Sequence, residues 1–144
     1  MNNQDGITLK GKLIISLNNK IVRETDNLVV TAGKEWVTAR MKDTSTVMTH
    51  MGIGTGTTAA VIGDTDLETV IGARLGLSTS GGTVAGAVIT YACSYPSGAH
   101  TGAITEAGIF TAVTSGTMLA RTVFTVVNKG ALDSMTISWA VTIS

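Results

Sequence analysis

The sequence predicts an all-β fold, an antiparallel β-sandwich or jelly roll with one short α-helix over about residues 32–42. Three observations support this prediction. The chain contains 24 Thr, 14 Val and 12 Ile, whose β-branched side chains fit a pleated sheet better than a helix. Seventeen Gly lie between the apolar segments and supply turns. The segments recur roughly every ten residues, with no helices between them that could build parallel βαβ units.

The first predicted elements form a β-hairpin. Residues 7–17, ITLKGKLIISL, are strand-forming, with Lys10 and Lys12 on one side of a period-two pattern. Asn18 and Asn19 tolerate left-handed backbone conformations and predict the turn. KIVRE at 20–24 is the returning strand, and NLVV at 27–30 is a further apolar strand.

Residues 31–42, TAGKEWVTARMK, change to helical spacing. Val37 and Met41 lie four residues apart, as do Trp36 and Arg40. Thr31 is the predicted N-cap residue. We expect a short amphipathic helix whose apolar stripe closes one end of the β core.

Strands resume from residue 46 to the end of the chain. The predicted strands are 46–54, 68–80 with a kink at Gly72, 87–95, 102–113 with a bulge near Gly108, 118–128 and 134–144, while GGTVAG at 81–86 is a predicted turn. The last strand alternates cleanly, with one face formed by Met135, Ile137, Trp139, Val141 and Ile143.

Residues 1–144 are predicted to form a single domain, because this length can bury a substantial core and no proline-rich or charged linker divides it. Residues 1–6 are polar and are expected to form an extended N-terminal arm. The N-terminus lacks the apolar region of a signal peptide, and no apolar run approaches the roughly 20 residues of a membrane helix. Cys93 is the single cysteine, so no intrachain disulfide is expected.

Charge is scarce and unevenly placed. Charged residues make up 14% of the chain, against roughly 25% in an average soluble domain. Residues 75–144 contain only Glu106, Arg121, Lys129 and Asp133. This scarcity predicts that part of the surface is buried against other subunits; a Thr/Ser-rich surface that is polar without charge is the alternative. Because the net charge is zero and no basic patch occurs, direct nucleic-acid binding is not expected.

MGIGTGTTAA at residues 51–60 is the motif that most suggests a phosphate site. Gly52, Gly54 and Gly56 are spaced G-x-G-x-G, whereas a dinucleotide fingerprint needs G-x-G-x-x-G between a strand and a helix, and a P-loop needs a following Lys. We therefore interpret the motif as a strand end. Met51 and Ile53 would point to the core, and the glycines would lie close against another strand or subunit.

Metal ligands are present but scattered. His50, His100 and Cys93 form no close-spaced pair, and we interpret them as two loop or surface histidines and a small buried thiol.

The segment DTDLE offers three carboxylates, Asp64, Asp66 and Glu68, but a calcium loop needs more oxygens and a particular turn glycine. A solvated acidic turn is the preferred interpretation, with a weak surface cation site as the alternative.

Glu106, in AITEAGIF, is the acid with the most unusual surroundings, because it lies among apolar residues where it could act as an acid or base. No other catalytic group is near it in sequence. We prefer the interpretation that it points outward or accepts hydrogen bonds from a neighbouring turn or subunit. The sequence thus predicts no catalytic, cofactor-binding or metal-binding residues, and no enzyme.

Four segments together resemble a family of small structural proteins of tailed bacteriophages. They are NLVVTAGKEWVTARMK (27–42), MTHMGIGTGTTAAVIGDTDLET (48–69), GAITEAGIFTAVTSGTMLARTVF (102–124) and VVNKGALDSMTISWAVTIS (126–144). The family pattern is an apolar strand before a short helix with an aromatic residue, a Gly/Thr loop, and a closing strand that contains Trp. The resemblance spans residues 27–144, and residues 1–26 match it least. Family members are virion, tail-fibre or capsid-associated proteins.

The resemblance implies a non-enzymatic virion structural protein made in the bacterial host cytoplasm. We expect a capsid cement (decoration) protein that binds the major capsid protein on the outer capsid surface, as a homotrimer. One compact domain without a coiled coil or a repetitive stalk favours the head. The alternative is a small tail, baseplate or tail-fibre-associated protein. A third class, a carbohydrate-binding β-sandwich, is disfavoured by the aromatic content of 4%.

Overall fold

The computed structural model describes residues 6–144. Its elements, in chain order, are β1 (Leu9–Leu17), β2 (Lys20–Asp26), β3 (Leu28–Val29), α1 (Thr31–Met41), β4 (His50–Gly54), β5 (Leu75–Gly76), β6 (Thr83–Ala85), β7 (Val88–Tyr95), β8 (Gly102–Phe110), β9 (Met118–Lys129) and β10 (Met135–Ile143). The predicted all-β fold with one short helix is confirmed. The expected N-terminal arm falls, except for Gly6, outside the described residues.

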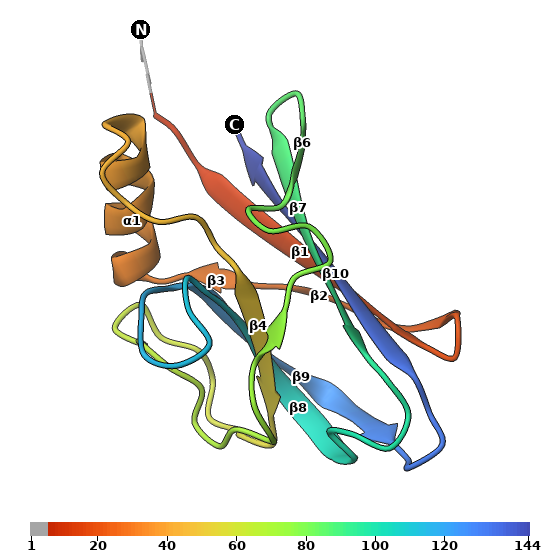
Figure 1. Ribbon diagram of the computed structural model, residues 1–144. Helices are drawn as coiled ribbons and strands as arrows, with labels where there is room; N and C mark the ends of the chain where they lie inside the picture. Colours follow the sequence, from red (N-terminus) through yellow and green to blue (C-terminus); the bar gives the residue numbers. More distant parts are fainter. Residues whose placement is uncertain (1–5) are drawn as a thin grey trace, which may run out of the picture.

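Two five-stranded antiparallel sheets pack face to face (Figure 1). The first sheet has the order β2-β1-β10-β7-β6, and the second has the order β3-β9-β8-β4-β5. β1 and β10 pair along their whole lengths, from Leu9 opposite Ile143 to Leu17 opposite Met135. The first and last strands of the chain therefore lie side by side at the centre of the first sheet.

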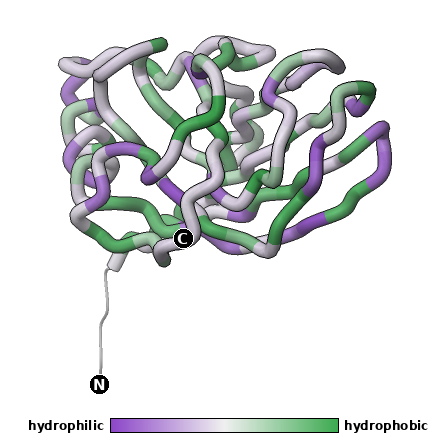
Figure 2. The backbone as a smooth tube through the Cα atoms, turned by 90° about the horizontal axis from the view of Figure 1, so that it is seen from below, coloured by the Kyte–Doolittle hydropathy of each residue, from purple (hydrophilic) through white to green (hydrophobic). Residues whose placement is uncertain are grey.

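The core between the sheets follows the period-two alternation of the strands. In β10, Ile137 and Trp139 are fully buried and Val141 is 3% exposed. Ile143, predicted on the same face, is 43% exposed because it lies at an open end of the sandwich. In Figure 2 the hydrophilic stretches are short and are separated by longer pale or hydrophobic ones, as the low charge content leads one to expect.

Helix α1 covers one end of the sandwich, as predicted, but two details differ. Val30, not Thr31, is the N-cap residue, and no side chain caps the helix. Trp36 and Val37 pack against the core, whereas Met41 is 82% exposed. The apolar stripe therefore ends one turn earlier than predicted, where the chain leaves the sheets.

The strands predicted at 46–54 and 68–80 are much shorter in the structure. β4 begins only at His50, and within 68–80 the structure has β5 and an isolated bridge between Val70 and Gly54. The predicted kink at Gly72 is present as a left-handed conformation with φ of 61°. The backbone of this segment leaves the strand conformation because its N–H groups bind a side chain of β8, as described below.

Turn predictions were closer to the structure. Asn18 and Asn19 have φ of 50° and 67°, as expected for the hairpin turn. The segment 81–86 begins with two left-handed glycines but also contains β6, which the prediction missed. The pairing of β8 with β9 shifts between Ile104 and Glu106 and again between Ile109 and Phe110. An irregularity therefore lies near Gly108, but the extra residues are in β9, not in β8 as predicted.

Candidate functional site

The Gly-rich motif ends β4 and forms part of the outer face of the second sheet. Met51 and Ile53 are fully buried in the core between the sheets, as predicted. Because side chains alternate along a strand, Gly52 and Gly54 face the other way. Opposite Gly54, across the β4–β8 pairing, lies Glu106.

A long segment, residues 55–74, folds over this outer face, and we call it the covering loop (Figure 1, the yellow to yellow-green chain between β4 and β5). A Cβ atom at Gly54 would lie 2.2 Å from the carbonyl oxygen of Thr69, and one at Gly56 would lie 2.5 Å from a carboxylate oxygen of Glu106. The glycines therefore allow the loop to approach the sheet closely. Gly54 therefore lies against this chain's own covering loop and not against another strand.

Glu106 is fully buried beneath the covering loop and anchors it. Its Oε1 accepts hydrogen bonds from the backbone N–H groups of Gly56 at 3.0 Å and Thr69 at 2.7 Å. Its Oε2 accepts one from the N–H of Glu68 at 3.0 Å. The predicted alternative, in which Glu106 accepts hydrogen bonds from a neighbouring turn, is the one observed.

Arg121 on β9 completes the cluster. Its Nε lies 3.0 Å and its Nη2 2.9 Å from Oε2 of Glu106, and its Nη1 lies 2.9 Å from Oδ2 of Asp64. Nη2 also donates to the carbonyl oxygen of Thr58 at 3.1 Å. Burial acts to lower the pKa of Arg121, but the bonds to the two carboxylates outweigh it and raise the pKa.

The three acids of DTDLE hold the covering loop, and two of them, Asp66 and Glu68, are exposed to solvent, as the predicted solvated turn requires. Asp64 binds Arg121, and Asp66 pairs with Arg74 at 3.3 Å. Glu68 accepts hydrogen bonds from the hydroxyl and N–H of Thr58 and from the N–H of a neighbouring residue, and these bonds lower its pKa. Each acid thus has its own partner, and they do not converge on a common point.

Arg74 fixes the last part of the covering loop. Its guanidinium lies 3.4 Å from the centroid of the Phe110 ring, a cation–π contact. Its Nη1 donates to the carbonyl oxygens of Ala112 at 2.9 Å and Ser115 at 2.7 Å. The loop is therefore tied to the turn between β8 and β9 as well as to the sheet.

The predicted soft ligands lie apart. The His50 ring bonds the Thr49 hydroxyl at 2.7 Å, and His100 Nε2 lies 2.7 Å from the carbonyl oxygen of Ala73. Cys93 is buried in β7, where burial raises the pKa of its thiol. Within residues 6–144, no group of three His, Cys, Asp or Glu side chains could hold a metal ion.

The chemistry of this cluster is structural. Glu106 has four donor groups around its two oxygens and is covered by protein, so a substrate could reach it only if the loop opened. Glu106 stands out in the sequence by its apolar neighbours, but Arg121 was not predicted as its partner. The available signal was that these are two of only four charged residues in the second half of the chain, on consecutive predicted strands.

The fold and the cluster define an antiparallel β-sandwich whose outer face is closed by a loop held on a buried carboxylate–guanidinium pair. No protein-family model, curated protein or solved structure matches the chain. Among the described residues, no helix is long and apolar enough to span a membrane.

Proposed function

We propose that this chain is a non-enzymatic bacteriophage virion structural protein, a capsid cement protein that binds the outer surface of the head and the major capsid protein. The sequence resemblance over residues 27–144 suggests the class. The observation that carries the proposal is the distribution of exposed charge, which favours a surface made for packing.

The second half of the chain presents almost no charge to solvent. Of its four charged side chains, Glu106, Arg121 and Lys129 are at most 2% exposed. The Lys129 ammonium donates to the carbonyl oxygens of Pro96 at 2.9 Å and Ala99 at 2.7 Å. Only Asp133 contributes charge to the surface of residues 75–144. Protein interfaces are depleted of charge at their centres, so this surface suits contacts with neighbouring subunits.

A neutral outer strip supports the same proposal. Along β10 and β7, the outward positions of the first sheet are Thr136, Ser138, Ala140, Thr142, Thr90, Ala92 and Ser94. Short side chains on a sheet lose little conformational entropy when they are covered. Such a face can lie against a capsid or another subunit at low entropic cost.

The copy number in purified virions tests the proposal. A cement protein should be present in amounts comparable to the major capsid protein, which quantitative gel densitometry or mass spectrometry of the particle measures. Recovery at only a few to tens of copies would favour the alternative, a small tail, baseplate or fibre-associated protein. Absence from the particle would reject both.

The trimer expectation has its own test. Native mass spectrometry of the isolated protein over a range of concentrations should show trimers. If only monomers are found, the protein should be examined on the capsid, since the major capsid protein can supply the symmetry. Monomers bound singly on the capsid would contradict the trimer.

A further inference from the structure

The edge of β6, the outermost strand of the first sheet, differs from the other edges of the sandwich. Thr83, Val84 and Ala85 are all exposed to solvent, and Val84 is 69% exposed. The strand contains no charged residue and no proline, and its pairing with β7 has no register shift. Natural sheets use charges, prolines and bulges to protect open edges, whose unpaired N–H and C=O groups accept another strand. The β6 edge therefore lacks the usual protection.

The opposite side of the sandwich is protected. β2, the other edge strand of the first sheet, carries the charged residues Lys20, Arg23, Glu24 and Asp26 among its seven residues. Its Arg23 side chain also donates to the carbonyl oxygens of Thr125 at 3.0 Å and Val126 at 2.9 Å, on the neighbouring edge of β9. The edges of both sheets are thus joined on this side.

On the side of β6, the remaining strand edges are occupied by the chain itself. The covering loop bonds the edge of β4, where the N–H of Ile71 donates to the carbonyl oxygen of Ile53 at 2.9 Å. Where β6 no longer covers β7, the N–H of Ser78 donates to the carbonyl oxygen of Ala92 at 2.8 Å. Within residues 6–144, β6 is therefore the regular strand edge that is left both uncharged and open.

The turn after β6 decides which backbone groups point outward. Two residues, the first of them Gly86 with φ of 60°, connect Ala85 to Val88, as expected for a two-residue hairpin turn with glycine first. The pair that flanks such a turn is hydrogen-bonded, and the next pair, Val84 and Ile89, is not, because the two kinds of pair alternate. The N–H and C=O groups of Val84 therefore point away from β7, toward the open edge.

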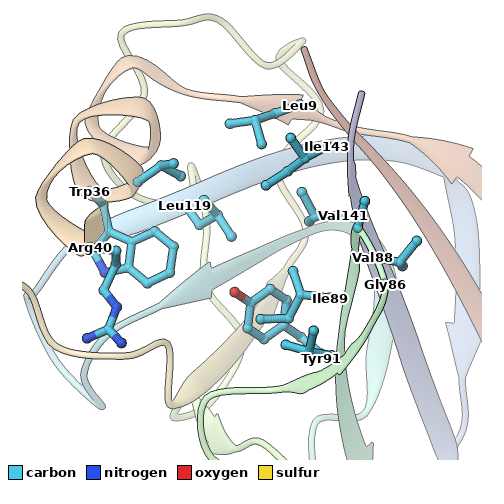
Figure 3. Close-up of a pocket in the computed structure, with 13 residues that line it drawn as sticks. Leu9, Trp36, Arg40, Gly86, Val88, Ile89, Tyr91, Leu119, Val141 and Ile143 are labelled. Atoms are coloured by element: carbon cyan, nitrogen blue, oxygen red, sulfur yellow. The ribbon is translucent and has the colours of Figure 1, made fainter. Parts of the chain in front are cut away.

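The Val84 side chain sets a second requirement for a partner strand. Val84 lies opposite Ile89, on the face of the sheet that packs against the core. It lines the apolar pocket of about 240 Å³ between α1 and the two sheets, together with Gly86 and Val88 of the same hairpin (Figure 3). A strand that pairs with β6 must therefore place an uncharged, apolar residue beside Val84.

We propose that β6 pairs with β6 of a second copy of this chain, antiparallel about a twofold axis at Val84. In a hydrogen-bonded antiparallel pair, two residues exchange both N–H···O=C bonds, so Val84 and Val84 of the partner subunit satisfy each other's outward groups. The axis also brings the two valine side chains together and places Thr83 opposite Ala85 of the partner subunit, with no charge on either strand. A second copy thus supplies both the backbone groups and the apolar side chain that this edge requires.

The contact is isologous and joins the two first sheets into one continuous sheet. Because β6 has only three residues, the buried area is small, and the dimer forms at high protein concentration. The inference does not depend on the proposed virion function, and a homotrimer would use a different surface.

Disulfide cross-linking tests this register. The Cα atoms of a hydrogen-bonded antiparallel pair lie about 5.5 Å apart, a distance that a disulfide can bridge, and the native Cys93 is buried. Val84→Cys should form a disulfide-linked dimer on a non-reducing gel after mild oxidation at high protein concentration. Val70→Cys, at a position that is 55% exposed in the covering loop, is the control. It should cross-link at least about tenfold more slowly, because no pairing raises the effective concentration of its thiol.

Val84→Lys gives a second test, because it places two like charges opposite each other across the axis. Sedimentation velocity should show a concentration-dependent dimer for the wild-type protein and for Val70→Lys, and its loss in Val84→Lys. The proposal is overturned if Val84→Cys and Val70→Cys cross-link at the same rate, or if Val84→Lys leaves the dimer unchanged. Either failure leaves the copy-number test of the virion function unaffected.

Discussion

Replacing Glu106 with Gln removes one charge from the centre of the buried cluster while keeping the size of the side chain. The two carboxylate oxygens accept hydrogen bonds from three backbone N–H groups of the covering loop and from the Arg121 guanidinium. A glutamine has one oxygen and one NH₂ group. Whichever way the amide turns, its NH₂ group faces donors that the carboxylate had accepted.

The magnitude follows from these contacts. If the glutamine oxygen faces Arg121, the N–H groups of Gly56 and Thr69 lose their acceptor, at about 1–3 kcal/mol for each buried group. If the glutamine oxygen faces the loop, the NH₂ group faces the Arg121 guanidinium, which loses one of its two anions. Arg121 is 2% exposed, and breaking a buried ion pair costs about 3–5 kcal/mol. The first orientation gives a loss of about 2–6 kcal/mol and the second about 3–5 kcal/mol, in either case a large part of the roughly 5–15 kcal/mol that stabilises a typical domain.

Urea unfolding followed by circular dichroism measures this loss by linear extrapolation. Glu24→Gln is the matched control, because it makes the same change in an exposed pair. Glu24 lies 3.9 Å from Lys12, with side chains 52% and 59% exposed, so its replacement should cost less than about 0.5 kcal/mol. Hydrogen exchange at the amides of Gly56 and Thr69 should accelerate only in Glu106→Gln.

Equal losses in the two variants would refute the reasoning that Glu106 holds the covering loop. A double-mutant cycle adds a second check. Arg121→Met alone leaves two carboxylates unpaired, Glu106 and Asp64, so the loss in Glu106→Gln/Arg121→Met should be smaller than the sum of the single losses. Strict additivity would mean that the two side chains act independently.

Three further predictions concern the covering loop and the surface. Gly54→Ala should cost about 1–3 kcal/mol through overpacking, whereas Gly76→Ala, where an added Cβ has nothing within 4 Å, should be close to neutral in the same urea assay. Arg74→Met should cost about 1–3 kcal/mol and increase proteolysis at 111–117; unchanged proteolysis would contradict this. Hydrogen bonds lower the pKa values of Glu68 and Asp133 in the folded protein, from ordinary values of 4.5 and 3.8. The two ionised carboxylates therefore stabilise the fold above these ordinary values, and this stability should be lost as the pH falls through the lowered pKa values. A urea midpoint that does not change at low pH would contradict this prediction.

Sequence patterns predicted correctly those elements whose conformation depends on residues close together in the chain. The Asn18–Asn19 turn and the buried face of β10 follow from conformational preference and period-two alternation. The covering loop could not be predicted in this way. Its backbone is held by Glu106, which lies 37 residues beyond Thr69 in the chain, and a strand-like composition at 68–80 gives no sign that the N–H groups will bind a side chain.

The structure shows that three of the four charged residues in the second half of the chain are buried and hold loops in place. Glu106 and Arg121 fix the covering loop, and Lys129 fixes the loop that contains Pro96 and Ala99. Ionised groups make strong and directional hydrogen bonds, and here they are used where they leave no charge on the surface. In the second half of the chain, the buried charges therefore fix loops without adding charge to the surface. Because buried pairs are screened by salt much less than exposed ones, the loop anchored on Glu106 should keep its protection from hydrogen exchange at high ionic strength.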